Sequence, residues 1–234
     1  MPAIMTNEQF RWNWVRERIG EIPAGQSLLD VGAGECFYKP DAAHLQYVAQ
    51  DLATYDGKGD GKGLQTREWN TSQIDLVCDL LDIPEDTLYD AVLCSEVLEH
   101  VADAPASVRK MCKLVKPGGQ IIITAPFVSM THFAPQHFAT GFSRYFYEHH
   151  LGVAGFDIVR MDANGNMFEL AAQEFNRGMD LIGVYSGKPM NNLLRRIGGR
   201  LTRMVASYGT RYPQSSEIGL FGWNVVAVRR PSEQ

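Results

Sequence analysis

The sequence has no long apolar run and no excess of basic residues. No apolar stretch approaches the ~18 residues that suggest a membrane-spanning helix. The N-terminal region carries Glu8, Arg11 and Arg16 where a signal peptide would have its apolar segment. The net charge is −5, with 22 Lys and Arg against 27 Asp and Glu, which argues against a general nucleic-acid-binding surface. We therefore expect a soluble, cytoplasmic protein that does not bind nucleic acid.

Paired cysteines are also missing. The four cysteines are scattered and form no C-x-x-C pair: Cys36, Cys78, Cys94 and Cys112. Three of them lie in or beside predicted core strands or their turns, so we expect reduced, structural thiols in a reducing compartment. The length of 234 residues and the hydrophobic fraction of 45% fit one domain with a sizeable core and a modest extension.

Two fingerprints of phosphate-binding sites are absent as well. There is no Gly-Lys-Ser/Thr of a Walker loop, and the third small residue of a G-x-G-x-x-G motif is replaced by Phe37. The glycine turn itself is present in residues 28–36, Leu-Leu-Asp-Val-Gly-Ala-Gly-Glu-Cys. This stretch is typical of a buried strand that runs into a tight turn, with a helix next.

An acid follows the glycine turn at the distance that a ribose-binding residue needs. Asp51 lies 21 residues after Asp30, at the end of a second apolar run, where it can accept hydrogen bonds from ribose hydroxyls. A third acid, Asp79, ends a further apolar run and can accept from an adenine amino group, while the next backbone N–H donates to a ring nitrogen. A ligand with a ribose but no phosphates fits this set, and S-adenosylmethionine is such a ligand.

Strands and helices are predicted to alternate from residue 27 to residue 125, which indicates a doubly wound α/β sheet. An N-terminal helix is predicted from a capping box at Thr6 and Gln9 to Gly20. The later predicted strands cover residues 47–50, 74–78, 89–94, 120–124, 156–159 and 223–228, and the later helices begin near Asp103, Ser143 and Met167. Residues 56–63, with four glycines at alternate positions, are either a flexible surface loop or a flap near the ribose end of the site.

These stretches resemble the class I S-adenosylmethionine-dependent methyltransferases. The matching segments are LLDVGAGEC, YVAQD, LVCDLLDIP, YDAVLCSEVLEHV and LVKPGGQIIITAP, in the family's order and spacing. The resemblance implies a seven-stranded Rossmann-like sheet of order 3-2-1-4-5-7-6, with strand seven antiparallel. It also implies one domain over residues 1–234, made of an N-terminal helix (1–22), a cofactor-binding core (27–126) and an acceptor-side half (127–234) with a helical lobe (167–208).

The resemblance also implies S-adenosylmethionine as the cofactor and a set of residues that hold it. These are Asp30, Gly32, Gly34, Asp51, Leu52, Asp79, Leu80 and Ser95. The first aspartate and the two glycines would cradle the methionine part, which Ser95 would border. The second aspartate would hold the ribose, and the third, with Leu80, would face the adenine. One departure from the family is Phe37, where relatives of this branch often have proline.

Residues 125–156 resemble a bacterial branch that is often associated with surface-polysaccharide and other glycan pathways. We therefore expect O-methylation of a sugar, a glycan or a related small-molecule hydroxyl. The alternatives are N-methylation of a small metabolite or amino sugar, and a non-catalytic methyltransferase-like scaffold. A nucleotide-binding oxidoreductase is disfavoured by Phe37.

A hydroxyl acceptor must lose a proton, and histidine is the usual base near neutral pH. His132 and His137 follow the fifth predicted strand, on the rim where acceptors bind, and are the candidate catalytic residues. His100 is expected to be structural. Glu96, Arg144 and Tyr145 are candidate substrate contacts. A His-x4-His metal site is not expected, because no acid cluster stands nearby in the sequence.

Residues 190–207 form a predicted basic amphipathic helix without any acid. Its apolar face holds Leu193, Leu194, Ile197, Leu201, Met204 and Val205, and four arginines (195, 196, 200 and 203) occupy much of the rest. Three interpretations are open: a solvated basic face over a packed apolar stripe, a cover that offers arginines to a phosphate-bearing or lipid-linked substrate, and a helix resting on an anionic membrane surface.

Overall fold

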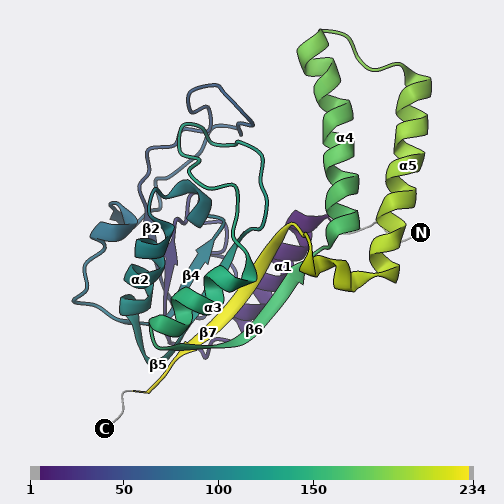
Figure 1. The fold of residues 1–234 in the computed structure, drawn as a ribbon. Helices are drawn as coiled ribbons and strands as arrows, with labels where there is room; N and C mark the ends of the chain where they lie inside the picture. The colour runs from purple at the N-terminus through teal and green to yellow at the C-terminus, as the bar shows by residue number, and fades with distance from the viewer. Residues whose placement is uncertain (1–5, 232–234) are drawn as a thin grey trace. The chain divides into compact units, whose positions relative to one another are not determined.

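A seven-stranded mixed sheet forms the centre of the larger of two compact units of the chain (Figure 1). The computed structural model describes residues 6–231. The strand order is β3-β2-β1-β4-β5-β7-β6, and β7 runs antiparallel to β5, which confirms the predicted topology. The strands are β1 (Ser27–Val31), β2 (Gln46–Asp51), β3 (Leu76–Val77), β4 (Tyr89–Ser95), β5 (Val115–Pro126), β6 (Phe156–Asn164) and β7 (Gly222–Arg229).

The parallel register brings the ends of the first strands to one edge of the sheet. Asp30 pairs with Ala49 of β2 and with Leu93 of β4, so β1 lies between these two strands. Further along, Ser95 of β4 pairs with Thr124 of β5. Because the carboxyl ends of neighbouring parallel strands meet at the same edge, the side chains that follow them converge on one crevice, where ligands bind in such folds.

The helix expected after the glycine turn is absent. Residues 32–45 form turns, and within the described chain the only α-helix between β1 and β5 is α2 (Ala104–Leu114). Gly34 and Cys36 both take left-handed backbone conformations, with φ of 56° and 57°, and Pro40 follows soon after. A right-handed helix cannot pass through such residues. The predicted alternation of strands and helices is therefore wrong for the first half of the sheet.

The N-terminal helix α1 (Asn7–Gly20) covers one face of the sheet. Its capping box is confirmed: Gln9 N donates to Thr6 Oγ1 at 3.1 Å, and Thr6 N donates to Gln9 Oε1 at 3.1 Å. Its buried residues join the sheet residues in one apolar cluster that includes Trp14, Val15, Ile19, Leu28, Ala91, Leu93, Ile122 and Val226. Alternate strand positions point to one face of a sheet, so this cluster is the core of the α1 side.

Two helices cover the other face, in front of the sheet in Figure 1. Helix α2 begins after Asp103, whose side chain accepts from Ala106 N at 2.9 Å, and it buries Met111 and Cys112 as predicted. Helix α3 (Arg144–Val153) follows Ser143 and buries Tyr147 and Leu151. Because α2 begins directly after the loop that leaves β4, its N-terminal end lies close to the crevice.

Residues 163–221 form the second compact unit, in the region of the predicted helical lobe. It consists of α4 (Met167–Ser186), α5 (Asn192–Arg211) and a short 3-10 helix (Pro213–Glu217). The two long helices form a hairpin after Gly187, which ends α4 with a φ of 68°. No helix in residues 6–231 combines the length and the apolar character needed to cross a membrane.

Candidate functional site

A cavity of about 370 Å³ opens at the carboxyl ends of β1, β2 and β4. Five of the eight predicted cofactor residues line it: Gly32, Asp51, Leu52, Asp79 and Leu80. The other three, Asp30, Gly34 and Ser95, lie outside the lining. The cavity lies entirely within the unit that holds the sheet.

The carboxylate of Asp51 is fixed by two backbone donors. Its Oδ2 accepts from Gly34 N at 3.0 Å, and its Oδ1 accepts from Ala53 N at 2.7 Å. An ionised carboxylate offers about four lone-pair sites, so two remain for the hydroxyls of a ribose. Asp51 is thus held in place before any ligand binds.

The two glycines of the turn have different roles. At Gly32, which has a φ of 67°, an added Cβ would lie 2.3 Å from Val97 Cγ2, so only glycine lets the chain line the cavity there. At Gly34 an added Cβ would lie 2.8 Å from the ring of Trp69. Gly34 therefore supports the site from outside the cavity, through its hydrogen bond to Asp51.

Asp30 and Ser95 also lie behind the cavity wall. Asp30 is 3% exposed, Tyr47 Oη donates to its Oδ2 at 2.5 Å, and burial raises its pKa to about 7. The hydroxyl of Ser95 lies 2.9 Å from that of Thr124. Both residues support the floor of the site.

At the other end of the cavity, Asp79 begins a 3-10 helix, Leu80–Asp82, and its Oδ1 accepts from Leu81 N at 2.8 Å. Leu80, Leu81 and Val101 give this end apolar walls. A flat heteroaromatic ring with one polar edge suits such a slot, and the placement of adenine there stays a prediction.

Three aromatic side chains from two long loops enclose the remaining side of the cavity. The Tyr55 and Phe133 rings stack with centroids 4.6 Å apart, and Trp69 meets Phe133 edge-on at 5.4 Å. The loops also pair through their backbones: Leu64 N donates to Thr131 O at 3.0 Å, and Phe133 N donates to Leu64 O at 3.1 Å. The glycine-rich loop thus packs beside the segment that carries His132.

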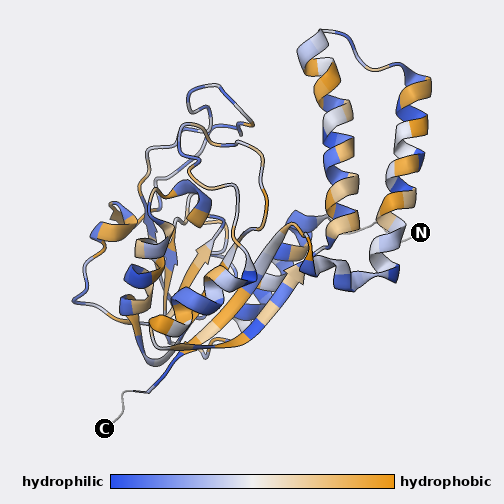
Figure 2. Ribbon diagram, in the orientation of Figure 1, coloured by the Kyte–Doolittle hydropathy of each residue, from blue (hydrophilic) through white to orange (hydrophobic). Residues whose placement is uncertain are grey.

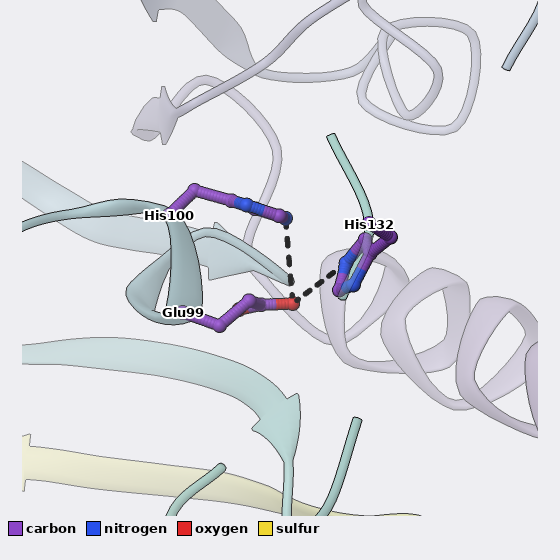
Figure 3. Close-up of side chains that lie close together, drawn as sticks. All are labelled: Glu99, His100 and His132. Atoms are coloured by element: carbon purple, nitrogen blue, oxygen red, sulfur yellow. Dashed lines mark ion pairs between the residues drawn. The ribbon is translucent and has the colours of Figure 1, made fainter. Parts of the chain in front are cut away.

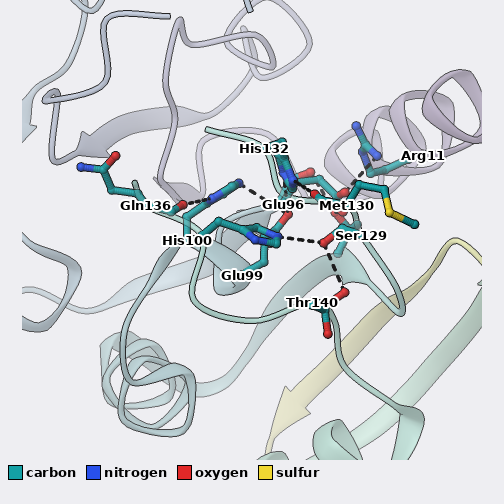
Figure 4. A network of polar contacts seen from close by, with 12 residues as sticks. Arg11, Glu96, Glu99, His100, Ser129, Met130, His132, Gln136 and Thr140 are labelled. Atoms are coloured by element: carbon teal, nitrogen blue, oxygen red, sulfur yellow. Dashed lines mark hydrogen bonds and ion pairs between the residues drawn. The ribbon is translucent and has the colours of Figure 1, made fainter. Parts of the chain in front are cut away.

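Glu96 lines the cavity and is held by two partners (Figure 4). Arg11 Nη1 of α1 lies 3.0 Å from Glu96 Oε2, and Thr124 Oγ1 donates to Glu96 Oε1 at 3.0 Å. Of the three predicted substrate contacts, Glu96 is the one placed at the cavity. Arg144 binds Glu148 on the first turns of α3, and Tyr145 is 71% exposed; neither lines the cavity.

Glu99, His100 and His132 converge beside the cavity (Figure 3). Glu99 is 1% exposed, and its Oε1 lies 3.7 Å from His100 Nε2 and 3.8 Å from His132 Nε2. His100, for which the sequence predicts a structural role, lines the cavity. The three side chains come from the turn after β4 and from the loop after β5, so strands four and five place them together.

The tautomers of the two histidines follow from their partners. His100 Nδ1 lies 2.5 Å from Gln136 O, and His132 Nδ1 lies 2.9 Å from Met130 O (Figure 4). A carbonyl only accepts, so each Nδ1 donates, and in a neutral ring each Nε2 then carries a lone pair. Burial lowers the pKa of His100 to about 4, which keeps its ring neutral. The lone pair of His100 Nε2 therefore points toward the Glu99 carboxyl group.

Two atoms of this cluster lack a partner. Glu99 Oε2 and His100 Nε2 are buried and make no hydrogen bond within the described residues. Burial, followed by repulsion from Glu96, raises the pKa of Glu99 well above its usual value. Buried acceptors without a donor are costly, and a proton or a cation among them would relieve that cost.

The cluster overturns one premise of the sequence analysis. A metal site was not expected because no acid stands near His132 and His137 in the sequence, but folding brings Glu99 against His132. The ligand atoms of Glu99, His100 and His132 all lie within 4.8 Å of one another, so these residues could hold a metal ion. His137 stays outside the group, since its Nε2 lies 3.1 Å from Ser129 Oγ.

Sequence reasoning missed several residues of the cavity wall. Tyr55, Trp69, Phe133 and Gln136 come from loops without periodicity, where nothing in the sequence marks a side chain as inward-facing. His100 carried a usable signal, because it lies in the segment SEVLEHV that follows the predicted strand 89–94.

The sequence was compared with protein families and with curated proteins. A family model described as a methyltransferase domain matches residues 9–202. Two similar curated proteins are ubiquinone biosynthesis O-methyltransferases. That of Leptothrix cholodnii is 31% identical over 118 residues, and that of Pseudomonas paraeruginosa is 34% identical over 123 residues. Each match covers 49% of this chain and 49% of the relative, so the chain spans about half the length of these proteins.

Solved structures share the fold. A sarcosine dimethylglycine methyltransferase, so named provisionally, from Galdieria sulphuraria has a TM-score of 0.53 and 14% identity, over 97% of this chain and 86% of that one. Magnesium protoporphyrin IX methyltransferase from Synechocystis, solved with bound S-adenosylmethionine, has a TM-score of 0.51 and 16% identity, over 95% and 80%. The cyclase SpnF, which catalyses a [4+2] cyclisation, has a TM-score of 0.54 at 16% identity, over 94% and 81%. At such identities the likeness shows the fold alone.

Proposed function

Because the chain belongs to the methyltransferase domain family and uses S-adenosylmethionine as its cofactor, we propose that it methylates a hydroxyl oxygen of a small-molecule, sugar or glycan acceptor. The observation that carries this proposal is the group of Glu99, His100 and His132 beside the cofactor cavity. A hydroxyl must lose its proton during methylation, and the Nε2 atom of a neutral histidine in this group can accept it.

The reaction is an in-line displacement. The acceptor oxygen forms a bond to the methyl carbon, the bond between that carbon and the sulfonium sulfur breaks with its electrons going to sulfur, and S-adenosylhomocysteine leaves. The enzyme's main contribution is to hold the two partners at attack distance. The hydroxyl proton goes to His132 Nε2, whose ring is oriented by the hydrogen bond from its Nδ1 to Met130 O at 2.9 Å.

The remaining polar groups fit supporting roles. Glu96, fixed by Arg11 and Thr124, lines the cavity and offers a carboxylate to acceptor hydroxyls. His137, the other predicted base, lies with its ring centroid 4.9 Å from that of His132, and its Nε2 faces Ser129. We assign His137 to orienting the loop, and we assign proton transfer to His132.

Two further points support an oxygen acceptor and a glycan in particular. The curated relatives that match half of the chain are named as O-methyltransferases. The likeness of residues 125–156 to a branch associated with glycan pathways supports a sugar or glycan. N-methylation of an amine is the second candidate. An alkylammonium group must also lose a proton before it attacks, so the preference for oxygen rests on the names of the curated relatives.

The test is a panel of matched acceptors, each offered as a hydroxyl compound and as the amine that replaces that hydroxyl. Formation of S-adenosylhomocysteine would be followed and the methylated atom located by mass spectrometry. We expect turnover with hydroxyl members and little with their amines. Methylation of the amines alone would overturn the proposal. Binding of S-adenosylhomocysteine without turnover on any member would favour a scaffold.

A further inference from the structure

The hairpin of α4 and α5 has an apolar face that no other residue of the unit 163–221 covers. We define the hairpin face as Phe175, Ile182, Leu194, Ile197, Leu201 and Met204. These six side chains are 45% to 58% exposed. Figure 2 shows apolar residues along both helices. The sequence left open whether this stripe is packed, and the structure places it in contact with solvent.

The apolar residues are exposed because small residues form the contact between the helices. An added Cβ at Gly198 would lie 2.2 Å from Met179 Sδ, so α5 approaches α4 closely at this point. Thr202 Oγ1 donates to Asn176 Oδ1 at 3.1 Å in the same contact. Since the buried side of α5 is built from Gly198 and Thr202, its bulky residues point elsewhere.

Both helices turn their apolar residues to the same side of the hairpin. On α5 the exposed residues recur at spacings of three and four, which places them in one row. On α4, Phe168, Phe175 and Ile182 recur at spacings of seven. The Phe168 ring lies 5.9 Å from that of Tyr208 on α5, so the two rows are neighbours. The hairpin face is therefore one surface made by two helices.

Arginines border this surface on α5. Arg196, Arg200 and Arg203 are exposed and make no ion pair within the described part of the chain, whereas Arg195 pairs with Asp180. Helix α5 contains no acid. Residues 163–221 carry seven Lys and Arg against four Asp and Glu, while the whole chain has a net charge of −5. Positive charge is thus concentrated beside the exposed apolar row.

We propose that the hairpin face docks on an anionic lipid surface. The apolar row enters the boundary between headgroups and acyl chains, and the three arginines bind lipid phosphates through their planar guanidinium groups. A basic border is complementary to anionic lipid. The same basic border disfavours pairing of two hairpin faces from two copies of this chain, because like-charged arginines would then face each other. The proposal does not depend on which atom the enzyme methylates.

The test is vesicle flotation of the full chain. One vesicle type contains phosphatidylglycerol and phosphatidylcholine, and the other contains phosphatidylcholine alone. We expect the wild type to float with the first and not with the second. Each basic residue near an anionic surface is worth about 1 kcal/mol, so replacing Arg196, Arg200 and Arg203 with glutamine should weaken partitioning roughly 100-fold.

Two further variants sharpen the test. Replacing Lys39, Lys58 and Lys113 with glutamine removes the same charge from exposed positions outside the hairpin and should leave flotation unchanged. Replacing Leu194, Ile197 and Leu201 with serine should abolish flotation, with circular dichroism showing that helix content is kept. Three results would overturn the proposal: no flotation of the wild type, equal losses in both charge variants, or a dimer in light scattering that the serine variant loses while vesicle binding is absent.

Discussion

At the scale of single residues, Asp51 is the best-defined candidate for a contact with the cofactor. Two backbone donors fix its carboxylate and leave lone pairs for the ribose. We expect Asp51→Ala to weaken S-adenosylhomocysteine binding by roughly 10- to 150-fold, because hydrogen bonds that involve a charge contribute about 1.5–3 kcal/mol. Titration calorimetry measures this, with Asp86→Ala as the control. Unchanged affinity in Asp51→Ala would remove this residue from the binding site.

Asp30 gives a prediction about pH. Burial raises its pKa to about 7, so its folded form prefers to be neutral. A raised carboxyl pKa contributes stability that is present below the unfolded value of about 3.9 and is lost as the pH rises through 7. The free energy of unfolding of the wild type should therefore fall between pH 4 and pH 8, by up to about 4 kcal/mol relative to Asp30→Asn. Chemical denaturation at several pH values tests this, and parallel curves for the two proteins would contradict it.

The group of Glu99, His100 and His132 predicts cation binding. The ligand atoms of these three residues lie within 4.8 Å of one another, and Nε2 of His132 cannot hold a metal ion and accept a proton at once, so we expect added Mn²⁺ to bind there and to inhibit turnover. Paramagnetic resonance of free Mn²⁺ during a titration would measure the affinity. Glu99→Gln should lower that affinity at least about tenfold, because it removes the only carboxyl ligand, and Glu68→Gln, at an exposed position, should not. Equally weak Mn²⁺ binding by the wild type, Glu99→Gln and Glu68→Gln would exclude the site.

At the scale of elements, two glycines test whether the loop after β2 positions the loop after β5 by contact. Gly61 and Gly63 both have left-handed backbones, with φ of 74° and 67°. A Cβ at Gly63 would lie 2.6 Å from Thr131 O, next to His132, whereas a Cβ at Gly61 meets nothing within 4 Å. The two alanine variants carry similar backbone strain, and only one displaces the histidine segment.

We therefore expect Gly63→Ala to lower turnover roughly 10- to 100-fold, as a small misplacement of a reacting group can do. Gly61→Ala should stay close to the wild type. Steady-state kinetics of both variants at saturating cofactor would decide, with cofactor affinity measured alongside. Equal rates in the two variants would show that the loop contact does not position His132.

The elements also show how much of the fold can be predicted from the sequence. The strands were predictable because their apolar runs end in acids or turns, and the family resemblance supplied the sheet order. The helix after Gly34 was predicted wrongly, because neither Gly34 nor Cys36 shows its left-handed backbone in the residue pattern. The pairing of Leu64 with His132 joins segments 68 residues apart, and local patterns do not encode such contacts.

At the scale of the whole molecule, the chain consists of a sheet-bearing unit that contains the cavity and a helical unit that contains the hairpin face. The cavity, Glu96 and the Glu99 group all belong to the first unit. Chemistry and surface docking are thus assigned to different parts of the chain. Variants of the arginines on α5 should accordingly leave cofactor affinity unchanged.

The central claim is that a hydroxyl is methylated with help from His132. The measurement that tests it most directly is the initial rate of S-adenosylhomocysteine formation with a hydroxyl acceptor from the panel, for the wild type, His132→Ala and the exposed control His149→Ala. We predict a kcat roughly 10²- to 10⁴-fold lower in His132→Ala, with cofactor affinity intact and His149→Ala unaffected. Full turnover by His132→Ala on that acceptor would contradict the account.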